Sequence, residues 1–132
     1  MRPLLLLLSV ALVLTGCEHE PFRAIGGKGG NATLNVYPSH HGVTAPLDSM
    51  VVYIKYDAED VPANGVYDDS ATCTYINSLP SCTFSGLTNG NYYLYSKGYD
   101  YNISARVKGG IPYTVKLQSA QNVNLPVGEE SL

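Results

Sequence analysis

The sequence predicts an all-β domain, a β-sandwich of about seven antiparallel strands, and three observations lead to this fold class. Short segments in which apolar and polar residues alternate recur along the chain, as in strands that bury one face of a sheet. Eleven tyrosines and 13 glycines favour strands and turns over helices. No segment shows a convincing apolar period of about 3.6 residues, and 132 residues suffice for a single domain.

A leader is the first element along the chain. Arg2 gives it a positive start, and residues 4–14 form an apolar run that is shorter than the roughly 20 residues of a membrane-spanning helix. The next residues, Leu14-Thr15-Gly16-Cys17, resemble the lipobox of bacterial lipoproteins. The resemblance implies that residues 1–16 are removed and that Cys17 is lipidated, and two or three acyl chains anchor a protein stably. An ordinary secretory signal peptide with an incidental cysteine is the alternative.

A tether is expected between this cysteine and the domain. Residues 17–31 lack an apolar period and contain the run Gly26-Gly27-Lys28-Gly29-Gly30, which predicts a flexible coil that reaches roughly 20 Å. The acidic start Glu18-His19-Glu20 resembles the export signals that send lipoproteins of the Bacteroidetes to the cell surface. We therefore expect the protein at the bacterial outer membrane, facing either the periplasm or the cell surface.

The domain is expected over residues 32–128, followed by a tail at 129–132. Alternation with one apolar face is clearest in the first two strand candidates. The candidates cover residues 32–37, 50–56, 72–76, 82–87, 91–97, 103–107, 113–117 and 122–127. Turn residues separate them, including Asn77-Ser78, Thr88-Asn89-Gly90 and Gly109-Gly110.

Cys73 and Cys82 are the one remaining pair of cysteines once Cys17 is lipidated. If residues 72–84 form a hairpin with Asn77-Ser78 at its tip, the two cysteines stand opposite each other, and a translocated chain permits a disulfide. A loop this short contributes about 2 to 3 kcal/mol in the chain-entropy estimate. A redox or metal site is the alternative, but the spacing of the two cysteines matches neither C-x-x-C nor a zinc motif.

One segment, CTFSGLTNGNYYLYSKGYD, contains the pattern Phe84-x-x-Leu87-x-x-Gly90-x-Tyr92-x-Leu94. This pattern resembles the central strand pair of transthyretin-like, or prealbumin-like, sandwiches, which include carboxypeptidase regulatory-like and Cna B-type domains. The resemblance implies an immunoglobulin-like or prealbumin-like arrangement in which Phe84 and Leu87 fill the core, Gly90 makes a tight turn and Tyr92 begins the next strand. With the lipobox and the segment VYIKYDAEDVPANGVYDD, the whole chain is similar to small lipoproteins of the Bacteroidetes, and this likeness implies no activity.

Carboxylates gather in the segment that follows the second strand candidate. They are Asp57, Glu59, Asp60, Asp68 and Asp69. Calcium takes six to eight oxygen ligands and is available outside the cell, so this loop is a candidate Ca²⁺ site. The spacing lacks the regular alternate ligands of an EF-hand, and a solvated acidic loop is the alternative. No other cofactor is expected.

Tyrosine is the other residue type in excess. If Tyr53, Tyr93, Tyr95 and Tyr113 all point away from the core, they form a platform for sugar rings or for a partner protein, because tyrosine offers a large amphipathic contact at low entropic cost. Outward tyrosines are also common in strands of a two-layer sandwich, and this is the competing interpretation.

The chain shows no motif for catalysis. His40-His41 lacks the H-x-H spacing of the iron dioxygenases built on a related sandwich, and adjacent histidines on a strand face opposite ways, so we interpret them as turn residues. No G-x-S-x-G, H-E-x-x-H or phosphate loop is present, and we do not expect an enzyme.

A binding function follows from these observations. Removal of the leader takes away Arg2 and leaves seven basic and eleven acidic residues, a formal net charge of −4, which disfavours nucleic acid as a partner. We expect a lipid-anchored binding or accessory module that contacts an envelope protein or a glycan. A purely structural envelope lipoprotein and a small hydrolase are the alternatives.

Overall fold

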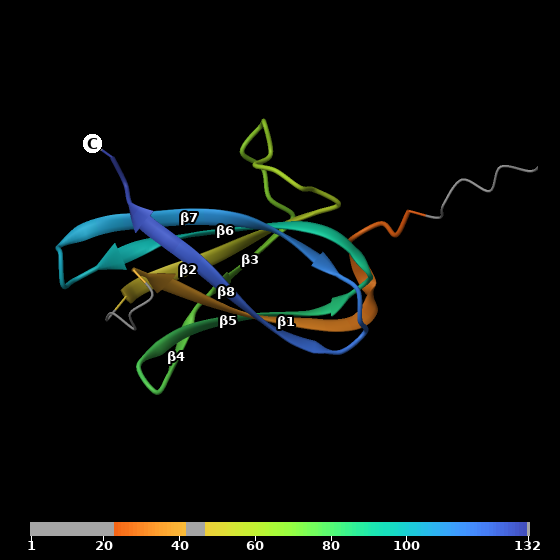
Figure 1. Ribbon diagram of the computed structural model, residues 1–132, viewed down its shortest axis with the longest axis horizontal. Helices are drawn as coiled ribbons and strands as arrows, with labels where there is room; N and C mark the ends of the chain where they lie inside the picture. Colours follow the sequence, from red (N-terminus) through yellow and green to blue (C-terminus); the bar gives the residue numbers. More distant parts are fainter. Residues whose placement is uncertain (1–22, 42–46, 132) are drawn as a thin grey trace, which may run out of the picture.

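Eight strands and no helix make up the computed structural model, which describes residues 23–41 and 47–131 (Figure 1). The all-β class predicted from the sequence is therefore confirmed. The strands are β1 (Lys28–His40), β2 (Leu47–Tyr56), β3 (Asp69–Thr72), β4 (Thr74–Ile76), β5 (Leu79–Leu87), β6 (Gly90–Asp100), β7 (Ala105–Val115) and β8 (Ala120–Glu129). A search of the same residues finds no helix with the length and apolar character needed to cross a membrane.

The strands form one mixed sheet in the order β3-β2-β6-β7-β8-β1-β5-β4. Most neighbours are antiparallel, but β1 and β8 run parallel, in register from Thr33↔Ala120 to His40↔Val127. The prediction of antiparallel strands alone is wrong at this pair. The reason is that residues 116–119 carry the chain from β7 to the start of β1, where β8 begins alongside it and the carbonyl of Ser119 accepts a hydrogen bond from the amide of Thr33 at 3.2 Å.

Residues 69–76 bend the sheet into a nearly closed barrel. β3 pairs with β2, and beyond Cys73 the same stretch continues as β4, which pairs with β5 at the other end of the strand order. The Cys73 amide donates to the Met50 carbonyl of β2 at 2.8 Å, so the chain stays attached to β2 up to the point where it leaves for β5. One bent segment thus joins the two edges of the sheet (Figure 1).

The core lies inside this barrel and follows the predicted alternation. The side chains that are most deeply buried come from alternate positions of β1, β2, β6, β7 and β8, together with the end of β5. They include Leu34, Val36, Met50, Val52, Ile54, Leu87, Tyr92, Leu94, Val107, Val115 and Leu125. Full burial of a Leu, Ile or Val side chain stabilises the fold by roughly 1.5 to 3 kcal/mol, so the alternating faces determine which side of each strand points inward.

A single long strand replaces two predicted ones in the region of Gly109-Gly110. The segments 103–107 and 113–117 were expected as separate strands with these glycines as the turn, whereas β7 runs through both glycines without interruption. A side chain at Gly109 would collide with the backbone of β8, and one at Gly110 would collide with the ring of Tyr93. Close packing on both sides of the strand explains the glycines, and the turn prediction is wrong.

The glycine-rich segment belongs to the folded domain, which corrects the tether predicted for residues 17–31. β1 begins at Lys28, and the amide of Thr88 donates to the carbonyl of Gly27 at 2.9 Å just before it. A side chain at Gly26 would collide with backbone at the start of β6. These glycines allow one stretch of backbone to lie against another, which composition alone cannot distinguish from flexibility. Residues 17–22 of the predicted tether lie outside the described residues.

The residues of the pattern around Gly90 lie in the core and at the start of β6. Phe84, Leu87, Tyr92 and Leu94 are all buried in the core. Gly90 has a φ of +145°, and a side chain there would collide with the backbone of residues 25 and 26. The Tyr92 hydroxyl accepts a hydrogen bond from the amide of Gly27 at 2.8 Å and donates to the carbonyl of Thr88 at 2.8 Å. Tyr92 therefore connects the segment before β1 to the turn between β5 and β6.

Candidate functional site

Three tyrosines meet on the outer face of β2 and β6, and we call Tyr53, Tyr67 and Tyr95 the tyrosine surface. Tyr53 and Tyr95 are register partners, and their ring centroids lie 6.1 Å apart. The ring of Tyr67 lies 5.4 Å from that of Tyr53 and is stacked on that of Tyr95 at 5.7 Å. All three rings are half-buried, so each keeps a part of its surface open to solvent.

Strand alternation and one loop place these rings. Val52 and Ile54 of β2 and Leu94 of β6 face the core, so Tyr53 and Tyr95 face outward. Tyr67 comes from the connection between β2 and β3 and reaches the same face because the amide of Asp68 donates to the carbonyl of Ile54 at 2.9 Å. This hydrogen bond returns the end of the connection to β2.

The structure divides the four tyrosines predicted to share a platform. Tyr53 and Tyr95 are together on the outer face. Tyr93 is on that face too, but it is only 8% exposed, and its ring lies against Gly110 of β7. Tyr113 faces the other way, packs against the core and donates its hydroxyl to Gln121 Oε1 at 3.0 Å. The predicted platform is therefore wrong for Tyr113, because this residue has the same strand parity as the buried Val115.

Tyr67 is the member that the sequence analysis missed. It lies in an irregular connection, where no period of two assigns a side chain to a face. Burial and the nearby Tyr93 and Tyr95 hydroxyls raise the pKa of Tyr67, so its hydroxyl stays protonated at neutral pH and is available as a hydrogen-bond donor.

Two shallow hollows flank the tyrosine surface. The first is lined by Tyr53, Gly65, Tyr67, Asp68, Asp69 and Ser70, which combines aromatic faces with carboxylate acceptors. The second lies beyond Tyr95 and contains Lys97 and Arg106. The ammonium of Lys97 is 5.3 Å from the centroid of the Tyr53 ring, within range of a cation–π contact. The surface thus offers apolar ring faces between an acidic side and a side where Lys97 and Arg106 stand with Glu130.

Three of the five predicted calcium ligands, Asp57, Glu59 and Asp68, make contacts with different parts of the protein. Asp57 pairs with Arg23 at 3.1 Å, and Glu59 accepts from the amide group of Asn91 at 2.5 Å. Asp68 accepts from Lys55 at 3.2 Å and from the backbone amide of Tyr56 at 2.7 Å. In the described part of the chain, these carboxylates form no group of three with ligand atoms close enough for one ion. Calcium binding by this loop stays a prediction.

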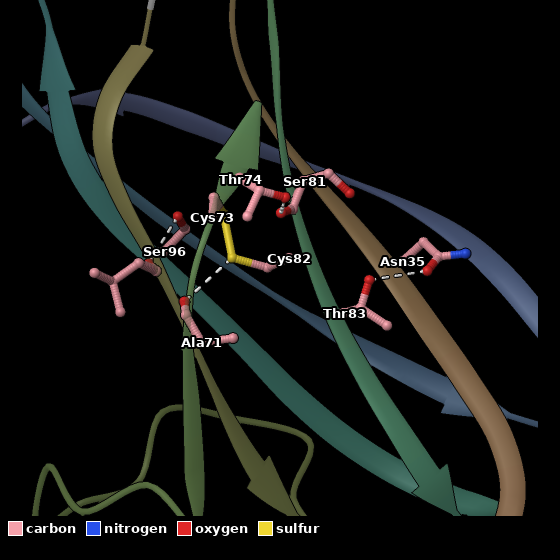
Figure 2. Close-up of a disulfide and its surroundings, with 9 residues drawn as sticks. Asn35, Ala71, Cys73, Thr74, Ser81, Cys82, Thr83 and Ser96 are labelled. Carbon is pink, nitrogen blue, oxygen red and sulfur yellow. Dashed lines mark hydrogen bonds between the residues drawn. A yellow bond between two sulfur atoms is a disulfide. The ribbon is translucent and has the colours of Figure 1, made fainter. Parts of the chain in front are cut away.

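Cys73 and Cys82 are joined in the structure, in agreement with the predicted bridge (Figure 2). Their Cα atoms are 4.5 Å apart, and the register of β4 with β5, from Thr74↔Ser81 to Ile76↔Leu79, places the two cysteines opposite each other. Asn77 and Ser78 have positive φ angles of 49° and 66°, as in a tight hairpin turn with two left-handed residues. The bridge fastens the segment that closes the barrel to β5.

A polar cluster lies where β1, β6 and β8 end. His40 and Asp100 are each 2% exposed, and His40 Nδ1 is 2.7 Å from Asp100 Oδ2. The other ring nitrogen, Nε2, is 3.5 Å from Glu129 Oε2, and His41 Nε2 is 3.3 Å from Glu129 Oε1. The hydrogen bond with His40 outweighs burial and lowers the pKa of Asp100. The pKa of Glu129 is lowered by a hydrogen bond from the backbone amide of Glu129 itself and by the hydrogen bond with His41.

The two adjacent histidines were interpreted as turn residues, and this interpretation is wrong for His40. His40 is the last residue of β1 and points inward, whereas His41 has a φ of +52°, which turns its ring back toward His40. Their ring centroids are 4.0 Å apart. The left-handed conformation of His41 breaks the alternation on which the prediction depended, and only His41 is a turn residue.

Comparison with protein-family models, with curated proteins and with solved structures finds no significant match to this chain. Its candidate sites therefore have to be judged on geometry and chemistry. Cys17, the predicted lipid attachment site, lies outside the described residues.

Proposed function

We propose that this chain is a lipid-anchored module of the bacterial envelope that binds a glycan or a protein through the tyrosine surface. The observation that carries the proposal is the contact of Tyr53, Tyr67 and Tyr95 rings from two strands and a loop, on a face that the core does not use. Rings held against one another lose little further freedom when a ligand packs on them, and this favours binding.

The surroundings of the rings suit a sugar or a polar peptide. A sugar ring can pack its C–H face on tyrosine while Asp69 and Ser70, in the adjoining hollow, exchange hydrogen bonds with its hydroxyls. Lys97 and Arg106 on the other side add positive charge for a carboxylate of the ligand. These groups are arranged for recognition, and we propose no reaction for them.

We also propose a finer description of the fold, a prealbumin-like sandwich with the layers β3-β2-β6-β7 and β8-β1-β5-β4. The short pairing of β7 with β8, which joins only Val107↔Glu129 and Lys108↔Gly128, supports a division of the sheet at this point. The placement of the Phe84 to Leu94 pattern in the core is compatible with the same arrangement.

The test compares capture by the full chain and by the double variant Tyr67→Ala/Tyr95→Ala. Envelope fractions are bound to each immobilised protein and analysed by mass spectrometry, and a glycan array is probed in parallel. Loss of two central aromatic contacts should cost about 2 kcal/mol or more, roughly 30-fold in Kd, for whichever ligand is found. The array arm separates a glycan ligand from a protein ligand.

Tyr75→Ala is the matched control, because Tyr75 is 44% exposed on β4, outside the tyrosine surface. It should leave binding unchanged. A ligand bound equally by the wild type and the double variant would overturn the proposed role of the tyrosine surface, as would equal losses in the double variant and in Tyr75→Ala.

A further inference from the structure

We propose that His40, His41 and Glu129 form a binding site for a divalent transition-metal ion of the zinc class. The three residues lie at the end of the barrel where β1 and β8 finish side by side, in parallel register up to His40↔Val127. The site is separate from the tyrosine surface, and the proposal does not depend on the function proposed above.

The distances fit the ion. The ligand atoms of the three side chains all lie within 4.8 Å of one another; His40 Nε2 is 3.5 Å from Glu129 Oε2, and His41 Nε2 is 3.3 Å from the other oxygen, Oε1. Two ligands bound about 2.0 to 2.1 Å from a tetrahedral ion are themselves about 3.4 Å apart. Two imidazole nitrogens with one carboxylate suit zinc and its neighbours in the first transition row, whereas calcium prefers oxygen ligands throughout.

A buried nitrogen without a hydrogen-bond partner points into the site. His40 Nε2 is buried and has no hydrogen-bond partner, although its ring is only 2% exposed. When the ring is neutral and Nδ1 donates its proton to Asp100, Nε2 carries a lone pair, and Glu129 Oε2, which also carries lone pairs, lies 3.5 Å from it. Two acceptors that face each other in this way repel each other unless a proton or a metal ion lies between them, and the open, two-histidine surroundings lead us to propose the metal ion.

Asp100 supports His40 in the manner of an outer-shell residue at a metal site. It accepts the Nδ1 hydrogen bond at 2.7 Å, and the amide of Asn102 donates to its other oxygen at 2.8 Å, so the carboxylate is held from two sides. A carboxylate behind a histidine fixes the tautomer and the ring orientation of a metal ligand. Asp100 therefore directs Nε2 toward Glu129 before any ion binds.

The site leaves one ligand position open to solvent. The side chains of His41 and Glu129 are 69% and 51% exposed, whereas His40 closes the inner side. Three protein ligands with an open fourth position is the arrangement in which a zinc ion carries a water molecule or accepts a ligand from a partner. We assign to this position a water molecule or a donor atom of a bound molecule.

Metal titration of the full chain, purified without a polyhistidine tag, tests the proposal. Zn²⁺ is titrated calorimetrically, and Co²⁺ is followed by its visible absorption, which is much stronger in tetrahedral than in octahedral coordination. We expect one equivalent of metal. Glu129→Gln and His41→Asn should each weaken binding at least tenfold, since loss of an outer-shell partner alone costs about 10- to 100-fold. Asparagine is chosen because it tolerates the left-handed conformation of His41.

Two matched controls should bind as the wild type does. Glu130→Gln removes the neighbouring carboxylate, which pairs with Lys108 at 2.9 Å, and His19→Gln removes the third histidine of the chain. Nitrogen-15 NMR of the His40 ring gives a second readout, because zinc at Nε2 replaces the proton expected there in an ion pair. Absence of saturable binding, or wild-type affinity in Glu129→Gln and His41→Asn, would overturn the proposal and assign the contact to a proton.

Discussion

Tyr92 shows how much a single side chain can hold together. Its ring fills the core, and its hydroxyl bonds to the amide of Gly27 and to the carbonyl of Thr88 at 2.8 Å each. We predict that Tyr92→Phe lowers the free energy of unfolding by about 1 to 3 kcal/mol, because the ring still packs while partly buried backbone groups lose their partner. Urea unfolding, followed by circular dichroism, measures the difference.

Tyr113→Phe is the control for this substitution. The Tyr113 hydroxyl bonds to Gln121 Oε1, and the amide nitrogen of Gln121 still donates to the carbonyls of Leu117 and Ser119 when the hydroxyl is removed. The expected loss is smaller than for Tyr92→Phe, about 1 kcal/mol or less, because one hydrogen bond to one side chain is lost. Equal losses in the two variants would show that the contacts of Gly27 and Thr88 with Tyr92 add nothing beyond an ordinary tyrosine hydroxyl.

Residues in regular strands could be assigned to a face from the sequence, and residues outside them could not. Tyr53 and Tyr95 were expected to point outward, and they do, because each lies between neighbours that are buried. Tyr67 and His41 have no such neighbours, since one lies in a loop and the other has a positive φ. Their contributions to the two candidate sites therefore depend on backbone conformations that have no periodic pattern.

At the scale of elements, the disulfide between the β3–β4 junction and β5 is a clear case for experiment. We predict that intact mass spectrometry without reductant finds the domain two hydrogens lighter than its reduced form. The double variant Cys73→Ala/Cys82→Ala should have a free energy of unfolding that is lower by about 2 to 3 kcal/mol, because the disulfide no longer restricts the unfolded chain. Urea unfolding of oxidised and reduced wild type measures the same difference without substitution.

The reduced wild type and the double variant form an internal check. If the reduced wild type and the double variant lose the same free energy of unfolding, the disulfide bond accounts for the loss. A larger loss in the variant comes from the packing of the two buried sulfur atoms, which the variant also removes. Alkylation of both Cys73 and Cys82 in protein taken from cells without reductant would refute the bridge.

The extent of the elements was harder to predict than their kind. The hairpin at Asn77-Ser78 was expected, because short alternating segments flank two residues that accept a left-handed conformation. Gly109-Gly110 and Gly26-Gly27-Lys28-Gly29-Gly30 were misassigned as a turn and a tether. In both places glycine permits close approach to another strand, and that approach exists only once distant strands have packed.

At the scale of the whole molecule, strand order decides which residues meet. The polar cluster unites residues that are far apart in the sequence. Asp100 follows His40 by 60 residues, and Glu129 follows His41 by 88 residues. They come together because β1 and β8 run parallel and β6 ends at the same end of the barrel. Alternation fixes the faces of strands but carries no information about their order, so this cluster was not predictable from the sequence.

The fold also gives the proposed anchor a direction. Residues 23–27 pack at the start of β6, and the polar cluster lies at its other end, about 33 Å away at the rise of roughly 3.3 Å per residue of a strand. A chain anchored at Cys17 has only residues 18–22 before this packed segment, a reach of at most about 20 Å. If Cys17 carries the anchor, we predict that the end with His40 and Glu129 lies on the side of the domain away from the membrane.

Replacement of Cys17 tests the anchor itself. We predict that Cys17→Ser moves the protein from the membrane pellet to the soluble fraction, because a stable anchor requires acyl chains on this residue. Cys73→Ser/Cys82→Ser should continue to pellet with membranes, since its two cysteines belong to the folded domain. Immunoblots of fractionated cells measure both variants. If Cys17→Ser still pellets, the anchor hypothesis fails and attachment must come from the folded domain or a partner; if it is released while the control pellets, Cys17 carries the attachment.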